Sequence, residues 1–140
     1  MQFEYGQTLL FSDFYNQNDL TNGNVYVTKS PMDKLVVYVT EEGKAPFDDW
    51  FDNLDTTAAL KVRIALARIE TGNLGDVKAV GQGVSERRIT FGPGYRVYFG
   101  KDGDKLVILL CGGTKKRQSK DIEQAKAFWG DYKIRKQKGD

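Results

Sequence analysis

The chain has 140 residues, of which 40% are apolar and 29% are charged, with a net charge of +2, one cysteine and no histidine. This size and composition are typical of a single globular domain. One cysteine cannot form an internal disulfide, and the lack of histidine excludes histidine-ligated metal sites and catalysis by a histidine base. No apolar run is long enough to span a membrane and no charged-then-apolar leader opens the sequence, so we expect a cytoplasmic protein without membrane contact.

Residues 1–33 differ in charge from the rest of the chain. They carry four acidic side chains and one lysine, a balance of −3, which leaves 20 basic and 15 acidic side chains in residues 34–140. Gln7–Tyr15 and Asn24–Thr28 are aromatic and β-prone, which argues against disorder. We interpret residues 1–33 as an N-terminal extension, an added strand or hairpin that pairs Asn24–Thr28 with the next strand, and residues 34–140 as the main domain.

The main domain opens with one predicted strand and two predicted helices. Lys34–Glu41 is rich in β-branched residues, which indicates a strand. Pro46 suits the first position of a helix over Phe47–Leu54. Thr56 or Thr57 would cap a second helix that ends at about Glu70. The apolar residues of the first helix recur at helical spacing: Phe47, Trp50, Phe51 and Leu54.

Two hairpins are expected next. A three-residue loop at 92–94 would pair Ile89 with Val97, and a two-residue turn at Asp102-Gly103 would pair Val97 with Ile108. Side chains alternate between the two faces of a strand, so this register collects the apolar residues on one face, which we expect to be the core. The opposite face would gather a polar set: Glu86, Arg88, Arg96 and Tyr98.

A helix over about Gln118–Lys136 is the last predicted element. Lys115-Lys116-Arg117, just before it, forms with Lys120 the densest basic cluster, and such a cluster suits a polyanionic partner. Cys111 follows the apolar run Leu106–Leu110, which predicts a buried and inert thiol. The apolar residues of the helix share one stripe: Ile122, Ala125, Phe128, Trp129 and Tyr132.

These residues form a long ordered pattern: GVSERRITFGPGYRVYFG, then LVILLCGGTK, then Gln118, Asp121-Ile122, Ala125 and Trp129. The pattern resembles the RelE/ParE superfamily of toxins from toxin–antitoxin systems, and within it the HigB-like branch of "addiction module killer proteins". The resemblance runs from about Leu35 to about Tyr132. It implies an α+β fold of order β-α-α-β-β-β-α, a small, mainly antiparallel sheet with two N-terminal helices and a C-terminal helix.

The resemblance also implies an activity and two partners. Toxins of this superfamily typically cleave mRNA in the ribosomal A site without a metal ion or cofactor. We therefore expect an mRNA endonuclease toxin that is neutralised by a cognate antitoxin, a separately encoded protein of the helix-turn-helix type. Some HigB-like nucleases rely on histidine, which this chain lacks, so the acid–base assignment stays open.

The expected reaction needs fixed positive charge. A 2′-hydroxyl must lose a proton and attack the adjacent phosphorus, and negative charge then develops on the phosphorane. Guanidinium groups suit this charge because they bind two phosphate oxygens at once, which points to Arg88 and Arg96 as a phosphate clamp. Tyr98 would stack on a base or share a proton, and Glu86 is the candidate general base. Four further basic residues would bind RNA or stabilise charge: Lys78, Lys115, Lys116 and Arg117.

Each of these residues also has a structural interpretation. Glu86 and Arg88 could form a surface ion pair, Arg96 could be an exposed amphipathic filler on its strand, and Tyr98 could be ordinary sheet packing. The lysines could be solvated loop charges. Two other functions also stay open. One is a ParE-like inhibitor of DNA gyrase, and the other is a degenerate binding protein whose basic face is covered by the acidic N-terminal extension.

Overall fold

The computed structural model describes residues 34–104 and 106–139. The predicted pairing of Asn24–Thr28 with the next strand therefore lies outside the described residues, as does the rest of the proposed extension. The elements, in chain order, are β1 (Lys34–Val37), α2 (Pro46–Asp52), α3 (Thr56–Glu70), β2 (Val77–Gly81), β3 (Val84–Ile89), β4 (Tyr95–Asp102), β5 (Leu106–Thr114), the 3₁₀-helix η2 (Lys115–Arg117) and α4 (Gln118–Gln137).

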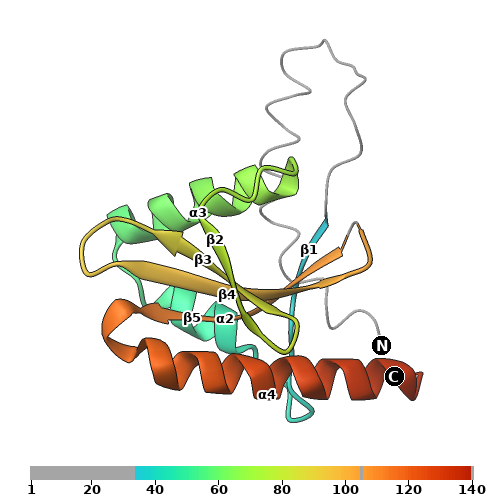
Figure 1. Cartoon of the computed structure of the whole chain (residues 1–140). Helices are drawn as coiled ribbons and strands as arrows, with labels where there is room; N and C mark the ends of the chain where they lie inside the picture. Colours follow the sequence, from blue (N-terminus) through green and yellow to red (C-terminus); the bar gives the residue numbers. More distant parts are fainter. Residues whose placement is uncertain (1–33, 105, 140) are drawn as a thin grey trace.

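The five strands form one sheet in the order β1-β5-β4-β3-β2, in which β1 runs parallel to β5 and all other neighbours are antiparallel (Figure 1). The predicted α+β class, with a mainly antiparallel sheet and a C-terminal helix, is confirmed. Four strands follow α3, however, where the sequence predicted three. The additional strand is β2, which is short and largely exposed and so carries no apolar run that would indicate a strand.

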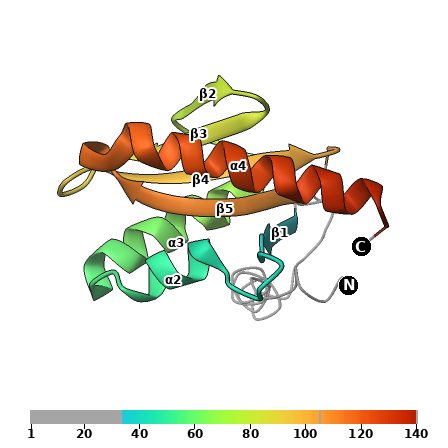
Figure 2. The same ribbon diagram turned by 90° about the horizontal axis from the view of Figure 1, so that it is seen from below.

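Helices cover both faces of the sheet. The pair α2 and α3 lies on one face and α4 runs along the other (Figure 2). Each face has its own apolar core, one that includes Phe47, Leu66 and Val97 and one that includes Ile108, Leu110 and Trp129. The expectation that only one face is buried is therefore wrong, because α4 folds back over the face that carries the polar residues.

The two helices between β1 and β2 begin at residues suited to helix starts. Pro46 opens α2, where its missing N–H is not needed. Asp55 caps α3, and its side chain accepts a hydrogen bond of 2.8 Å from the Ala58 N–H, so Asp55 has the capping role predicted for Thr56 or Thr57. This cap defines where α3 begins, and its buried apolar residues pack it against the sheet.

The register of β3 and β4 differs from the predicted one by two residues. Ile89 pairs with Tyr95 rather than with Val97, because the connecting loop spans residues 90–94 and closes with a hydrogen bond of 2.9 Å from the Gly94 N–H to the Phe91 carbonyl. A shift of two leaves every side chain on its predicted face. Two pairs of the polar set are now direct neighbours: Glu86 with Tyr98, and Arg88 with Arg96.

The register of β4 and β5 was also predicted wrongly, and here the shift changes faces. Val97 pairs with Gly112 instead of Ile108, β4 continues to Asp102, and a bulge lies between Tyr98 and Phe99. Asp102 and Gly103 therefore do not form the predicted two-residue turn, because Asp102 is part of β4 and pairs with Leu106. Since β5 is covered on both faces, its residues Leu106–Cys111 are all apolar, and such a run has no alternation from which a register can be predicted.

Candidate functional site

A buried polar cluster lies between the sheet and the start of α4. Its centre is the Glu86 carboxylate, and one oxygen of that group, Oε2, accepts hydrogen bonds from the Tyr98 hydroxyl at 3.0 Å and the Gln118 side-chain amide at 2.8 Å. Arg96 Nε lies 3.3 Å from the same oxygen. We call Glu86, Arg96, Tyr98 and Gln118 the Glu86 cluster. It joins β3 and β4 to the first residue of α4.

Three members of the Glu86 cluster are buried, and Gln118 is partly exposed. Glu86 and Tyr98 have 0% of their surface exposed, and Arg96 has 9%. Arg96 was expected to be exposed, and this was wrong because α4 covers its face. A charged carboxylate away from water is costly unless donors surround it, and the ion pair with Arg96 and the two hydrogen bonds offset that cost at Oε2. The other oxygen, Glu86 Oε1, has no hydrogen-bond partner among the described residues.

The burial restricts what two of the predicted site residues can do. The Tyr98 ring has no exposed surface on which a base could stack. Its pKa lies above the ordinary value, first because of burial and then because of the negative Glu86 beside it, so the phenol stays protonated. Glu86 has no surface that an external hydroxyl could reach, which does not fit a general base acting on a large substrate.

A glycine makes room for a second buried carboxylate. Gly113 pairs with Arg96, and a Cβ atom on it would lie 1.9 Å from Asp121 Oδ2, so any side chain there would force Asp121 to move. The pKa of Asp121 is raised by burial, an effect that Arg117 opposes from 3.7 Å. Sequence reasoning gave no role to Asp121 or Gln118, although both lie in the quoted family pattern.

Arg88 lies at the rim of the cluster, partly exposed. Its Nη2 donates a hydrogen bond of 2.8 Å to Asp76 Oδ1, so its ion-pair partner is Asp76 rather than Glu86. The Arg88 hydrogen bond holds the pKa of the Asp76 carboxyl below its usual range. Asp76 precedes β2, the strand that sequence analysis missed, so no pattern in the sequence connected it with Arg88.

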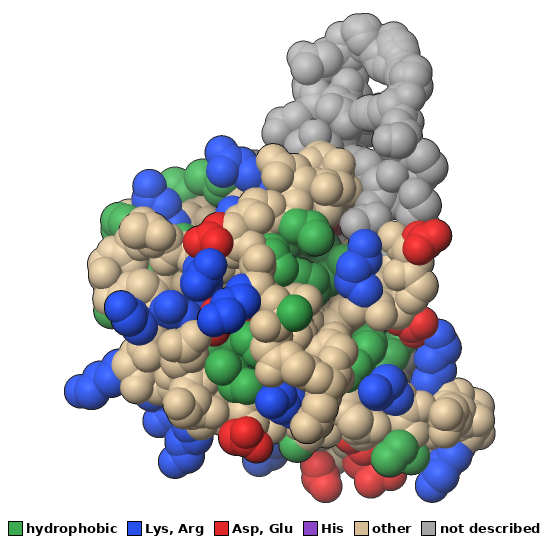
Figure 3. Space-filling view, in the orientation of Figure 1, with side chains coloured by type: hydrophobic (Ala, Val, Ile, Leu, Met, Phe, Trp, Pro, Cys, Tyr) green, Lys and Arg blue, Asp and Glu red, His purple; other side chains and the backbone are tan. Residues whose placement is uncertain are grey.

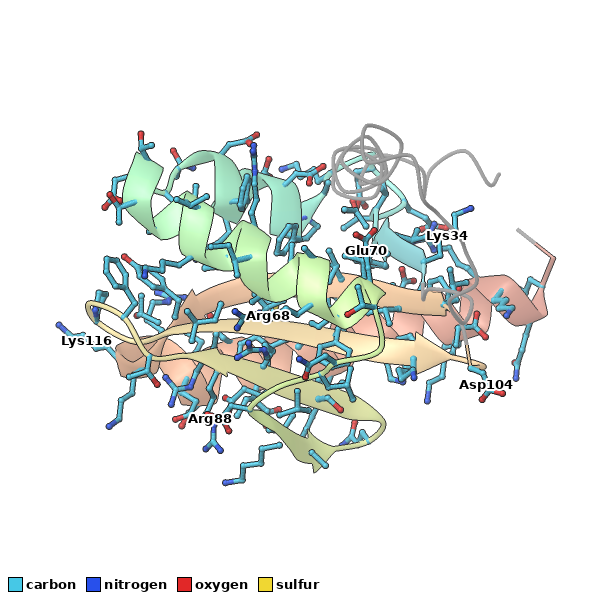
Figure 4. The ribbon with its side chains drawn as sticks, turned by 90° about the horizontal axis from the view of Figure 1, so that it is seen from above. Lys34, Arg68, Glu70, Arg88, Asp104 and Lys116 are labelled. Carbon is cyan, nitrogen blue, oxygen red and sulfur yellow. The ribbon has the colours of Figure 1, made fainter. Side chains whose placement is uncertain are left out.

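The remaining predicted basic residues surround this rim. Lys78 pairs with Glu86 across β2 and β3 and is exposed. Lys115, Lys116 and Arg117 form the exposed η2, which is tied to the β3–β4 loop by a hydrogen bond of 2.8 Å from the Lys115 N–H to the Gly94 carbonyl. Lys116 and Arg88 lie toward the same end of the sheet (Figure 4), and lysine and arginine side chains gather on that side of the molecule (Figure 3).

Cys111 is buried, as predicted. Burial raises the pKa of its thiol to about 12, and its Sγ lies 3.9 Å from the Asp121 carbonyl. A thiol with this pKa is almost entirely protonated near neutral pH, so Cys111 does not have the properties of a nucleophile.

Two further properties of the described part of the chain bear on site chemistry and location. No three His, Cys, Asp or Glu side chains there are grouped so that they could hold a metal ion. None of the described helices has the length and apolar character of a membrane span.

Comparison with known proteins finds a clear sequence relative. The chain is 48% identical over 81 residues to an uncharacterized protein of Haemophilus influenzae, a match that covers 57% of this chain and 82% of the relative. No family model matches the chain. The name of the relative assigns no activity.

Proposed function

We propose that this chain, which belongs to the same family as the Haemophilus influenzae protein, is the toxin of a toxin–antitoxin module with a RelE-like, HigB-type fold. Its proposed activity is cleavage of mRNA in the ribosomal A site, in the cytoplasm and without a metal ion. The observation that carries the proposal is the pair Arg88 and Arg96, which lie side by side on β3 and β4 with Arg96 held by a buried carboxylate.

The arginine pair has the geometry of a phosphate clamp. Directly paired residues of antiparallel strands have Cβ atoms about 4.5–5.5 Å apart, so the two guanidinium groups can add their charge at one place. The partly exposed Arg88 would contact the phosphate, and the largely buried Arg96 would support it from behind. Two neighbouring cations repel each other when no anion is nearby. Glu86 offsets this repulsion at Arg96 and Asp76 offsets it at Arg88, so the pair stays in place before RNA binds.

This geometry supports a different role for Glu86 than the general base expected from sequence. Its fully buried carboxylate fixes Arg96 through the ion pair and fixes Tyr98 and Gln118 through hydrogen bonds. Glu86 is then a positioning residue. The catalytic contribution of the site is oriented positive charge at the phosphorane, and electrostatic stabilisation of this kind often accounts for most of the rate enhancement by an enzyme.

The exposed basic residues extend the site along the RNA. Lys78 on β2 and the Lys115–Arg117 segment of η2 flank the arginine pair and are available to phosphates on either side of the cut. Asp121 is buried beside Gly113 and pairs with Arg117, so it orients one end of this basic surface.

The proposal is tested by tightly controlled expression followed by mapping of mRNA 5′ ends. We expect in-frame, codon-specific breaks in the mRNA. We also expect the purified protein to cleave mRNA when a chelator has removed free divalent ions and the ribosomes are still intact. Arg88→Ala is the matched inactive variant, because it removes one clamp residue from the rim. DNA damage with intact mRNA would instead identify a gyrase inhibitor. If neither mRNA breaks nor DNA damage is observed, the chain is a binding protein without catalysis.

A further inference from the structure

One arginine is buried on the side of the sheet that faces away from the Glu86 cluster. Arg87 lies on β3 between Glu86 and Arg88, so its side chain is on the opposite face, the one covered by α2 and α3. Only 8% of Arg87 is exposed. A guanidinium group has five N–H donors and keeps its positive charge near neutral pH. The fold therefore takes a full positive charge out of water at this position.

Contacts with the backbone hold the Arg87 guanidinium in place. A Cβ atom on Gly75 would lie 2.8 Å from Arg87 Cζ, 2.8 Å from Nη2 and 2.9 Å from Nε, so the flat side of the group rests against Gly75. Gly75 has φ +73°, a left-handed conformation that glycine adopts without strain. Arg87 Nη1 donates a hydrogen bond to the Arg88 carbonyl. These two contacts orient the group without offering it a negative charge.

The charge of Arg87 has no carboxylate of its own among the described residues. Asp76 acts on it from nearby, but the ion pair and the hydrogen bond of Asp76 are with Arg88. Arg87 Nε is buried and has no hydrogen-bond partner within the described ranges. Burial lowers the pKa of Arg87, Asp76 raises it, and the neighbouring Arg68 lowers it again. Arg87 is thus a buried cation with an unused donor and a second cation close by.

Arg68 and the loop before β2 connect this place with solvent. Arg68 is an exposed residue of α3, and it forms no ion pair with any described residue. In Figure 4 it lies between α3 and the strands, whereas Arg88 projects from their other side. Gly75 and Asp76, in the loop between α3 and β2, are exposed as well. An ion from solvent therefore has access to Arg87 beside this loop.

We propose that Arg87 and Arg68, with Gly75 beside them, form a binding site for a phosphate group on the α2/α3 side of the sheet. A terminal phosphate carries about −1.5 to −2 charges at pH 7 and accepts several charge-assisted hydrogen bonds, which matches two guanidinium groups. A carboxylate has one negative charge and offsets only one of the two cations. The site is separate from the arginine pair and does not depend on the nuclease function.

The test measures binding of inorganic phosphate to the full chain by isothermal titration calorimetry, at constant ionic strength and with chloride as the reference anion. Three variants are compared with the unaltered chain. Arg87→Met removes the buried charge, and Arg68→Gln removes the exposed one. Lys61→Gln is the matched control, because Lys61 is also an exposed basic residue of α3.

We expect the unaltered chain and Lys61→Gln to bind phosphate equally. Arg68→Gln should bind it about tenfold more weakly, since one charge-assisted hydrogen bond is lost, and Arg87→Met should show no saturable binding. Lack of saturable binding by the unaltered chain, or equal binding by all four proteins, would overturn the proposal. If Arg87→Met loses its folded circular dichroism spectrum, Arg68→Gln decides, because substitution of an exposed side chain changes stability little.

Urea unfolding in phosphate and in chloride gives a second readout. A ligand that binds only the folded state stabilises it, so phosphate should raise the unfolding midpoint of the unaltered chain more than that of Arg87→Met. Phosphate also stabilises proteins because it is excluded from their surface, but this contribution is common to all four proteins. An equal increase for the unaltered chain and Arg87→Met would contradict the site.

A further measurement distinguishes free phosphate from the phosphates of RNA. Binding of a short RNA without terminal phosphates is followed by fluorescence anisotropy for the unaltered chain, Arg68→Gln and Lys61→Gln. We expect equal RNA binding by all three, which assigns the site to free or terminal phosphate. A loss in Arg68→Gln alone, comparable to its loss of inorganic phosphate binding, would assign the site to the RNA backbone. Absence of mRNA cleavage would refute the nuclease function and leave the phosphate result unchanged.

Discussion

The two faces of the sheet are buried in different ways. The face under α2 and α3 is an apolar core in which Phe47, Leu66 and Leu109 have no exposed surface. The face under α4 combines an apolar core with the Glu86 cluster and Asp121. The buried charged groups on the α2/α3 side are Arg87 and Glu70. Burial on the α4 side includes two carboxylates and two arginines, Glu86, Asp121, Arg96 and Arg135, groups that gain little stability from leaving water.

This difference implies that the two faces respond differently to mutation. A residue of the α2/α3 face should affect the free energy of unfolding, with activity per folded molecule unchanged. A residue of the Glu86 cluster should affect both quantities. Four pairs of measurements test this comparison, from the largest expected effect on stability to the smallest.

The largest effect is expected for Glu86→Ala. The substitution leaves the Arg96 charge and the Tyr98 and Gln118 donors buried without their shared acceptor, and loss of one partner from a buried ion pair costs about 3–5 kcal/mol. Urea unfolding measures this loss. We also expect cleavage per folded molecule to fall at least a hundredfold, because Arg96 loses its fixed position.

Leu109→Ala is the control on the other face. It should lower stability by about 2–5 kcal/mol through the cavity that it leaves. Its cleavage rate, divided by the folded fraction from circular dichroism, should equal that of the unaltered chain. If Leu109→Ala reduces this rate as strongly as Glu86→Ala does, the two faces are not functionally distinct.

Two adjacent glycines of β5 allow a closer comparison. A Cβ atom on Gly112 would lie 2.2 Å from the Trp50 ring, on the α2/α3 face, and one on Gly113 would lie 1.9 Å from Asp121, on the α4 face. Alanine at either position should lower stability by about 1–3 kcal/mol, since the neighbour must move. Only Gly113→Ala should lower mRNA cleavage, because it displaces Asp121, the ion-pair partner of Arg117. Equal loss of cleavage in both variants would contradict this assignment.

A smaller effect should come from titration of Cys111 on the α4 face. Its pKa is about 12 in the folded protein and 9.0 for an unperturbed thiol. Because the folded pKa is the higher one, stability from the neutral thiol is complete below pH 9 and is lost as pH rises toward 12. Between pH 8 and pH 10 we expect the unaltered chain to lose about 1 kcal/mol more stability than Cys111→Ala. If the free energies of unfolding of the two proteins change with pH in parallel, the Cys111 thiol is not shielded from solvent and this prediction is wrong.

The smallest effect on stability is expected at the rim. Arg88→Ala removes a partly exposed ion pair with Asp76, so the melting temperature should stay nearly unchanged. Cleavage should nevertheless be abolished, because one of the two clamp arginines is missing. Arg63→Ala on the outer side of α3 is the basic control, and it should retain cleavage. Full activity of Arg88→Ala would exclude the clamp.

The sequence by itself determined which residues share a strand face. Alternation along β3 and β4 is a local property of extended backbone, so Glu86, Arg88, Arg96 and Tyr98 fall on one face even though the predicted register was wrong by two residues. Buried Cys111 and the start of the final helix at Gln118 were also predictable, because they depend on hydrophobicity and spacing within short segments.

Only the tertiary structure decided what covers each face. No local pattern predicts that α4 returns across the polar face, and this return buries Glu86 and Tyr98 and adds Gln118 and Asp121 to the site. The register of β5 was likewise undetermined, since the continuous apolar run Leu106–Cys111 fits several registers equally well. Contacts between segments far apart in the chain fixed the site, because alternation and helical periodicity describe only neighbours in sequence.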